Sequence, residues 1–379
     1  MSADGNYAAC LTPAGTGAIA TLALRGKWVW PVVRELFRPA AQQSLPVAVP
    51  ESGRVWPGQF GTGIVDEVVL SVKQSAPLPW VEVHCHGGSA VVAALLEQLQ
   101  QRGANLLSWA DFLRLTEPPW RAAALEKLAQ ARTARTAAIL LDQANGAFER
   151  ALESIRGQLR DGNFRAARAE IAELLAFADL GCHLVAPWRV VIAGAPNVGK
   201  SSLVNALAGF QRSIVAPIPG TTRDLVTTEI AIDGWPVELI DTAGQRTESV
   251  SLEREGIELA RQAMARADLI VWVLDTVTTP VWPDEISSLM YIAINKIDLQ
   301  PTWDVAKAEA LLVSARTGTG IAGLCAAISL RLAPGPLAPG RGIPFLASQI
   351  EALKLARDCL DSTTPASALE AIGEARMEP

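Results

Sequence analysis

The chain has 379 residues, of which 50% are hydrophobic and 19% are charged, and its formal net charge is −6. This composition excludes a disordered chain, and the length allows two or three domains with buried cores. The negative balance gives no overall attraction to nucleic acid or anionic membranes, so DNA binding and membrane association are not expected. No stretch approaches the ~20 apolar residues of a membrane span, and the five scattered cysteines suit reduced thiols, so we expect a soluble, cytoplasmic protein.

Residues 1–115 mix short apolar runs with glycine and proline, which predicts an α+β domain. Three of these runs predict strands, at residues 19–24, 65–72 and 81–83. Residues 89–101 predict a helix. His84 and His86 alternate on one strand face, but no third ligand lies nearby, so a zinc site is not favoured.

Residues 116–185 are rich in alanine and have leucines at helical spacing, which predicts the first part of a helical domain. Between Glu117 and Asp179, nine lysine and arginine residues face nine acidic residues. This balance favours solvated helix faces over an RNA-binding stripe.

Residues 333–379 are predicted to hold a linker and a second helical part. Proline and glycine at 333–342 indicate the linker, and a helix is expected at 345–359. Cys359 lies in the apolar pattern of that helix, so it is expected in the core. The residues that follow are expected to be frayed.

In residues 186–332, short β-rich runs alternate with helical segments, which predicts a parallel α/β sheet. Apolar runs predict its strands, at residues 190–193, 237–240, 269–274 and 291–294. Between the first strand and a predicted helix at 201–208, closed by Gly209, the run Gly194–Ser201 fits the pattern G-x-x-x-x-G-K-[ST]. Strand, loop and helix in this order predict a phosphate-binding P-loop rather than an ordinary glycine-rich turn.

The P-loop supplies the groups that a nucleotide triphosphate needs. Glycines let backbone N–H groups converge on phosphate oxygens, and the helix N-terminus adds a favourable dipole. Lys200 reaches the outer phosphates, and the Ser201 hydroxyl can ligate Mg²⁺. The predicted phosphate-binding residues are Asn197, Val198, Gly199, Lys200, Ser201 and Ser202.

Two further segments are expected around the γ-phosphate. Asp241 ends a predicted strand, where its carboxylate can hold Mg²⁺ through water, and Gly244 can donate its N–H to the phosphate. Between the P-loop and this strand lie Thr221 and Thr222, and the Thr222 hydroxyl is a candidate second ligand for Mg²⁺.

The purine base is expected to be read by Asn295, Lys296 and Asp298, which follow another predicted strand. The Asp298 carboxylate can accept hydrogen bonds from N1–H and the exocyclic amine of guanine. Adenine would leave the carboxylate unpaired, so GTP is favoured over ATP. Ser314 and Ala315 supply a second loop beside the base.

With these motifs, the chain resembles the MnmE (also called TrmE) family of tRNA-modification GTPases. The resemblance rests on four runs, Gly194–Ser202, Ile218–Asp224, Asp241–Gly244 and Leu252–Glu258. It implies an α/β P-loop GTPase domain inserted in a helical domain, with an N-terminal α+β domain for folate binding and dimerisation. It also implies GTP hydrolysis in modification of the tRNA wobble uridine, as a homodimer with a flavoprotein partner.

The resemblance also implies roles for single residues and cofactors. Asn197 matches the position that ligates a catalytic K⁺, and a turn residue is the alternative. Glu253 matches the family's water-orienting glutamate, whereas Gln245 directly follows Asp241–Gly244, where other GTPases carry a catalytic glutamine. Glu253 is favoured, and Gln245 stays open. In the family, the N-terminal domain binds a formyl-tetrahydrofolate.

The sequence departs from the family in the parts that serve tRNA modification. The last residues lack the family's Cys-x-Gly-Lys motif, and the helical signature differs at 125–132. The run Leu22–Gly26 moves the arginine of the family pattern. Only nineteen residues separate Asp275 from Asn295, so the helix before the base-reading strand must be clipped.

These departures leave other functions open. A GTP-dependent switch or assembly protein that has lost the modification chemistry is the alternative to the modification enzyme. A nucleotide-binding scaffold without turnover would require both Glu253 and Gln245 to be misplaced.

Overall fold

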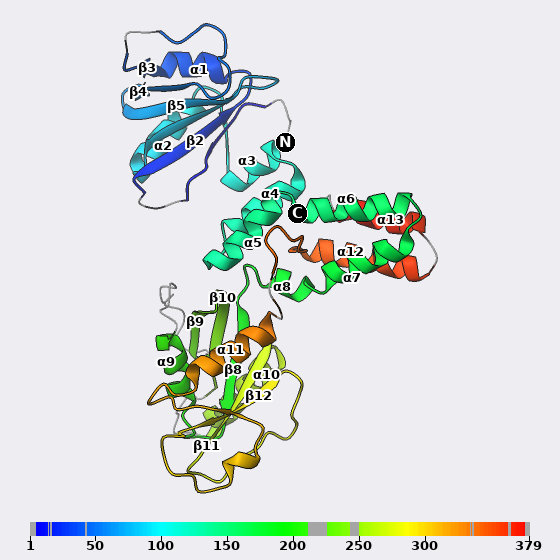
Figure 1. The fold of residues 1–379 in the computed structure, drawn as a ribbon. Coiled ribbons are helices and arrows are strands. Elements are labelled where there is room, and N and C mark those ends of the chain that lie inside the picture. The colour runs from blue at the N-terminus through cyan, green and yellow to red at the C-terminus, as the bar shows by residue number, and fades with distance from the viewer. Residues whose placement is uncertain are drawn as a thin grey trace. The chain divides into compact units, whose positions relative to one another are not determined.

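The computed structural model describes residues 5–13, 15, 17–41, 44–210, 226–242, 250–333, 335, 337–362 and 365–375, with backbone alone at 226, 250–257 and 365. Two compact units, Met1–Pro118 and Pro119–Pro379, make up the chain (Figure 1). Within the described ranges, no helix is both long enough and apolar enough to cross a membrane.

The first unit is built on a seven-stranded sheet in the order β3-β4-β5-β6-β2-β1-β7. Its strands are β1 (Tyr7–Cys10), β2 (Ile19–Arg25), β3 (Phe37–Pro39), β4 (Val55–Phe60), β5 (Asp66–Gln74), β6 (Trp80–His86) and β7 (Asn105–Leu107). Its helices are α1 (Val29–Leu36), α2 (Ser89–Gln100) and α3 (Trp109–Thr116). All neighbouring strands are antiparallel except β1 and β7. The three predicted strands and the helix are confirmed as β2, β5, β6 and α2.

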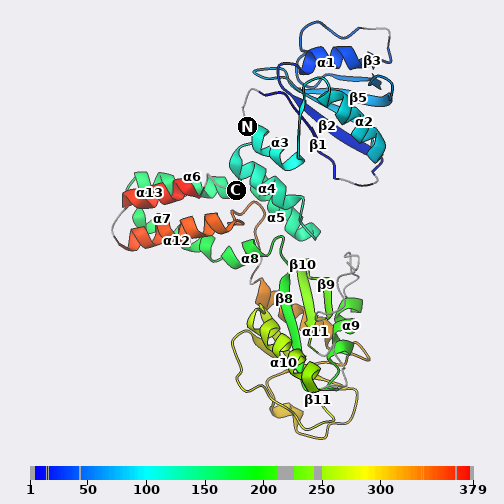
Figure 2. The same cartoon turned by 180° about the vertical axis from the view of Figure 1, so that it is seen from behind.

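Alternation along the strands gives this sheet two different faces. On β6, Val81, Val83 and Cys85 are buried against α1 and α2, which cover one face (Figure 2). The opposite face carries the alternate side chains of β6, and only part of it is covered, where Phe112 of α3 packs on Ala9 and Ala23. The uncovered part holds the candidate N-terminal pocket described below.

The second unit contains a six-stranded sheet in the order β13-β12-β11-β8-β10-β9. Its strands are β8 (Trp188–Gly194), β9 (Val226–Ile232), β10 (Trp235–Asp241), β11 (Leu269–Asp275), β12 (Met290–Asn295) and β13 (Leu311–Leu312). Its helices are α9 (Lys200–Phe210), α10 (Val250–Ala265), the 3₁₀ helix η1 (Val305–Lys307) and α11 (Ile321–Leu332). All pairings are parallel except that of β9 with β10, and the four predicted strands are confirmed.

Helices cover both faces of this sheet, as parallel strands require. Leu203 of α9 and Leu324 of α11 belong to the core on one face, and Ala263 of α10 to the core on the other. One prediction is wrong: α9 continues through Gly209 to Phe210, because Gly209 has no positive φ that would end a helix. The clipped connection is confirmed, since the described residues 276–289 contain no helix.

The described residues of the second unit form seven more helices: α4 (Pro119–Leu128), α5 (Ala134–Ala144), α6 (Ala147–Arg160), α7 (Phe164–Leu175), α8 (Ala178–Cys182), α12 (Ala347–Asp361) and α13 (Pro365–Glu374). Helices α6, α7, α12 and α13 share one hydrophobic core, in which Ile155, Leu353 and Ile372 are fully buried and against which Cys359 packs. Segments on either side of the sheet domain in sequence therefore meet. The expectation of frayed last residues is wrong for α13.

Candidate nucleotide site

The predicted site residues gather at one edge of the parallel sheet. Strands β8, β11 and β12 run in the same direction, and their registers pair Val273 with Gly194 and Asp275 with Asn295. The loops that follow these strands therefore leave from neighbouring points at the carboxyl edge, which is where open α/β sheets bind ligands.

The P-loop backbone takes conformations that only certain residues tolerate. Gly199 has a φ of +94°, and a Cβ there would collide with the side-chain amide of Asn295, so only glycine fits. Asn197 also has a positive φ, of 65°, which asparagine adopts more readily than most residues. Gly199 thus allows the P-loop to approach the loop that begins at Asn295.

Lys200 and Ser201 open helix α9. Lys200 is only 6% exposed, and its ammonium donates to the carbonyl oxygens of Gly194 and Ala195 at 2.9 and 2.8 Å. Burial lowers the pKa of Lys200, and the negative charge of Asp241 partly opposes this shift. The lysine is therefore a desolvated cation held inside the phosphate loop, where an anionic ligand would interact with it strongly.

Ser201 and Asp241 lie together although forty positions separate them. The Ser201 hydroxyl donates to Asp241 Oδ2 at 2.5 Å, and Asp241 is 3% exposed at the end of β10. A hydroxyl and a carboxylate form an all-oxygen donor set of the kind Mg²⁺ prefers. The residues present fit that ion.

Asn295 joins the phosphate loop to the two base-side loops. Its side-chain amide donates to the Val198 carbonyl at 3.0 Å, and its Oδ1 accepts the Ala315 N–H at 3.0 Å. Asn295 and Val198 are both 2% exposed, so these hydrogen bonds are shielded from water. One side chain thus fixes three predicted site segments relative to one another.

Asp298 is oriented by residues of the second base-side loop. The fully buried Ser314 donates its hydroxyl to Asp298 Oδ1 at 2.6 Å, and the Arg316 guanidinium donates to Oδ2 at 2.9 Å. The Ser314 hydrogen bond is the main cause that lowers the pKa of Asp298, so the carboxylate is ionised at neutral pH. Arg316 Nη2 also lies 2.7 Å from Oδ2, so both oxygens of this carboxylate, which offers about four lone-pair sites, are engaged by residues of the second base-side loop.

Of the remaining predicted site residues, one is exposed, and the others lie wholly or in their side chains outside the described residues. Ser202 is exposed in the first turn of α9. Thr221, Thr222, Gly244 and Gln245 lie outside the described residues. The backbone of Glu253 belongs to α10, and its side chain lies outside the described residues, so the choice between Glu253 and Gln245 stays a prediction.

The sequence reasoning missed Asp275 and gave Arg316 no role. Asp275 ends β11 and pairs with Lys296 Nζ at 2.5 Å, and Lys296 also donates to the Asn197 carbonyl at 2.7 Å. A signal existed, because a single aspartate ends an apolar strand that neighbours the P-loop strand. Its partner could not be read from the sequence.

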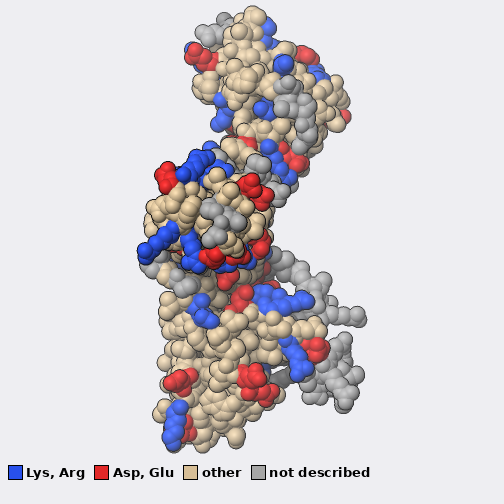
Figure 3. Space-filling view, turned by 90° about the vertical axis from the view of Figure 1, so that its right-hand side faces the viewer, with Lys and Arg blue, Asp and Glu red and all other residues tan. Residues whose placement is uncertain are grey.

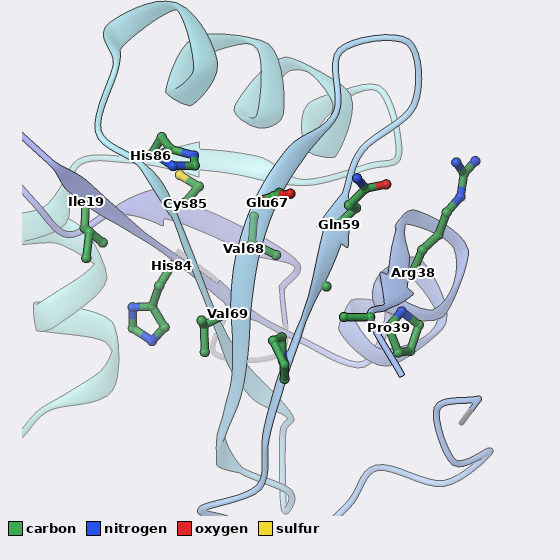
Figure 4. A pocket seen from close by; sticks show the side chains of 13 residues that line it. Ile19, Arg38, Pro39, Gln59, Glu67, Val68, Val69, His84, Cys85 and His86 are labelled. Atoms are coloured by element: carbon green, nitrogen blue, oxygen red, sulfur yellow. The ribbon is translucent and has the colours of Figure 1, made fainter. Parts of the chain in front are cut away.

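The N-terminal unit holds a cavity of about 600 Å³ on the partly uncovered face of its sheet. Ile19, Val69 and His84 lie on one side of it and Arg38 and Gln59 on the other (Figure 4). His84 Nδ1 lies 3.0 Å from Thr21 Oγ1, and His86 Nδ1 lies 2.7 Å from Asp66 Oδ1. No group of three metal-ligating side chains occurs among the residues that the structure describes.

Comparisons with known proteins place these motifs in context. A family described as 50S ribosome-binding GTPase matches residues 189–304. The protein named tRNA modification GTPase MnmE from Synechococcus sp. (strain RCC307) is 33% identical, with 83% of this chain and 78% of that protein covered. The proteins of the same name from Symbiobacterium thermophilum and Chloroflexus aurantiacus are 33% and 34% identical, with 93% and 90% of this chain and 88% and 84% of those proteins covered.

Among solved structures, the G domain of the FeoB iron transporter from T. maritima is 26% identical, with 38% of this chain and 98% of that chain covered. The TM-score of this match is 0.27.

Proposed function

This chain belongs to the MnmE family of tRNA modification GTPases, and we propose that it binds GTP with Mg²⁺ and hydrolyses it in the service of tRNA modification. The observation that carries the proposal is the joining of the phosphate loop to the base-side loops by Asn295. Because triphosphate and purine must be bound together, loops that are already fixed to each other favour a nucleotide over a simple anion.

Transfer RNA modification is tested by complementation in a bacterium that lacks its own MnmE. Restored wobble-uridine modification is the expected result, measured by mass spectrometry of tRNA nucleosides. GTP turnover without restored modification would instead favour the GTP-dependent switch, since the helical signature at 125–132 departs from the family.

For Mg²⁺, we propose Ser201 as a direct ligand and Asp241 as a ligand through water, with Thr222 as the second hydroxyl ligand. The pairing of Ser201 with Asp241 supports the first two assignments. When bound, Mg²⁺ neutralises charge on the β- and γ-phosphates. Lys200 and the P-loop amides then stabilise the remaining charge on the outer phosphate oxygens.

Asn197 is proposed to ligate K⁺ through its side-chain oxygen, because it is exposed at the tip of the P-loop. Replacing Asn197 by alanine is expected to bring the ratio of GTP turnover in K⁺ to that in Na⁺ close to one, while the unaltered protein is faster in K⁺. Exposed Asn205 of α9 offers a matched control, and Asn205→Ala should keep the ratio. A ratio unchanged by Asn197→Ala would remove the cation role.

Glu253 is proposed to orient the attacking water, with Gln245 as the alternative. Both are polar side chains in the sequence that follows Asp241, close to the expected γ-phosphate. Separate alanine substitutions, assayed by phosphate release at saturating GTP, distinguish them, because only the water-orienting residue should lower kcat strongly.

The N-terminal cavity is proposed to bind a formyl-tetrahydrofolate. Ile19 and Val69 offer apolar surface to a pterin ring, and Arg38 offers a cation to the glutamate carboxylates. Equilibrium dialysis with the labelled cofactor tests this, and an Arg38→Ala variant should bind more weakly. Equal retention by the two proteins would argue against this site.

Homodimer formation is proposed through the same face of the N-terminal sheet. Ile19, Val55 and Val69 are 64%, 56% and 40% exposed there, and clustered exposed apolar side chains mark interaction surfaces. Sedimentation should give a dimer, and Val55→Asp should weaken it. A flavoprotein is the proposed second protein partner.

The proposed domains are 1–115 for folate and dimerisation, 116–185 and 333–379 for one helical domain, and 186–332 for the GTPase domain inserted in it. The shared core of α6, α7, α12 and α13 supports the insertion. Any tRNA contact would need a local basic surface, since lysine and arginine alternate with acidic residues on the face shown in Figure 3.

A further inference from the structure

The carboxylate of Asp275 is buried at the end of β11, next to Lys296 of the first base-side loop, Asn295–Asp298. Asp275 is the last residue of β11 and is 1% exposed, so it contacts neither solvent nor, by its position, a bound nucleotide. A buried charge costs free energy unless it is paired and hydrogen-bonded. Its partners therefore decide what it does.

Every oxygen of this carboxylate is held in place. Oδ1 accepts the Val277 N–H at 3.1 Å and both the N–H and the hydroxyl of Thr278 at 2.7 Å. Oδ2 accepts from Lys296 Nζ at 2.5 Å. Burial opposes ionisation of Asp275, but the hydrogen bonds from Lys296 and Thr278 outweigh it and keep the pKa below its ordinary value. The carboxylate is thus a fixed negative charge.

Lys296 connects this fixed charge to the phosphate loop. Its ammonium also donates to the Asn197 carbonyl at 2.7 Å. Lys296 and Asn197 both hold left-handed backbone, with φ of 62° and 65°. Asparagine adopts this conformation more readily than most residues, whereas a lysine keeps it only when surrounding contacts impose it. The backbone of Lys296 belongs to the base-side loop and its ammonium contacts the phosphate loop, so the position of this side chain affects both loops.

We infer that Asp275 is a positioning residue for the guanine nucleotide: it holds Lys296 against the Asn197 carbonyl and so locks the base-side loop to the phosphate loop. This inference rests on the proposed GTP site and goes beyond its motifs, because Asp275 acts through Lys296 without touching the ligand. A lock of this kind lowers the ordering cost of binding, since the loops are fixed before the nucleotide arrives.

The test compares the affinity of the full chain for a fluorescent GDP analogue, mant-GDP, in the presence of Mg²⁺. Asp275→Asn keeps the shape of the side chain and removes its charge, and the Kd is expected to rise between about tenfold and about a hundredfold. The matched control is Asp268→Asn. Asp268 immediately precedes β11, accepts the Arg189 N–H and pairs with His183, so its loss perturbs the other end of the same strand. This control should bind mant-GDP like the unaltered chain.

A double-mutant cycle separates positioning from a general structural role. If Asp275 acts through Lys296, then Asp275→Asn combined with Lys296→Met should bind no more weakly than Lys296→Met alone. Additive losses would show that Asp275 acts by another route and would overturn the inference. A Kd for Asp275→Asn within twofold of the unaltered chain would overturn it as well.

Thr278→Val covers the case in which Asp275→Asn does not fold. It removes one donor to Oδ1 and leaves the charge pair in place, so a smaller rise in Kd, of roughly threefold, is expected. No change in that variant would overturn the inference. If the unaltered chain itself binds guanine and adenine nucleotides equally, the proposed function fails. If the unaltered chain selects guanine and Asp275→Asn binds mant-GDP equally well, only the positioning role of Asp275 fails.

Discussion

Replacing Lys200 by alanine is expected to lower the rate of GTP hydrolysis by about 10²–10³-fold or more. Lys200 is 6% exposed, and its ammonium is held at the Gly194 and Ala195 carbonyls, inside the loop that we propose binds the outer phosphates. Preorganised charge in a site with little water contributes more to transition-state stabilisation than the same charge in solvent. Phosphate release under single-turnover conditions measures the loss.

The control for this substitution is Lys307→Ala. Lys307 is in the same domain, but its side chain is 85% exposed and pairs with Asp304 three positions away. The Lys307→Ala protein should hydrolyse GTP at the rate of the unaltered protein. Burial lowers the pKa of Lys200, so its positive charge does not stabilise the folded state. The thermal-unfolding midpoint of Lys200→Ala should therefore stay within about 4 °C of that of the unaltered protein. A folded Lys200→Ala protein with full turnover would contradict the phosphate role.

Replacing Asp298 by asparagine is expected to weaken GTP binding by about 10²-fold or more and to abolish the preference for GTP over ATP. The carboxylate, held by Ser314 and Arg316, would be replaced by an amide whose N–H₂ group faces the donors of guanine. Xanthosine triphosphate has a carbonyl in place of the exocyclic amine, so the variant should favour it. Competition against mant-GDP measures all three nucleotides.

Asp304→Asn is the matched control for the base-reading assignment. Asp304 is an exposed acid of the same domain, paired with Lys307, and its loss should leave nucleotide selectivity unchanged. Guanine selectivity that survives in Asp298→Asn would place base recognition elsewhere in the site.

Much of the sheet domain could be predicted from the sequence because its signals are local. Apolar runs and the punctuating motif Gly194–Ser201 mark strand, loop and helix directly. The clipped connection between Asp275 and Asn295 followed from length alone and is confirmed. Site residues that belong to motifs were found for the same reason.

The misses have physical causes. The sequence marks helix α13 only weakly, because two of its buried residues, Ala368 and Ala371, are small and Ile372 is the one large buried aliphatic residue among these three. Strands β3 and β7 have only three residues each, which is too short for a period-two pattern. Gly209 was expected to end α9, but a glycine ends a helix only where the chain turns left-handed.

Contacts between distant residues were beyond the sequence. The bridge from Asp275 through Lys296 to Asn197 spans 99 positions, and only the register of β11, β8 and β12 brings its members together. The pairing of Ser201 with Asp241 likewise depends on the position of β10 beside β8. A local sequence pattern identifies such residues individually, whereas the strand order and register of the sheet determine which of them are in contact.

Phosphate release by the purified chain, with Mg²⁺ and equal concentrations of GTP or ATP, tests the guanine site most directly. Hydrolysis of GTP with little or none of ATP is the predicted result, because Asp298 is an ionised acceptor aimed by Ser314. Equal rates for the two nucleotides would contradict it.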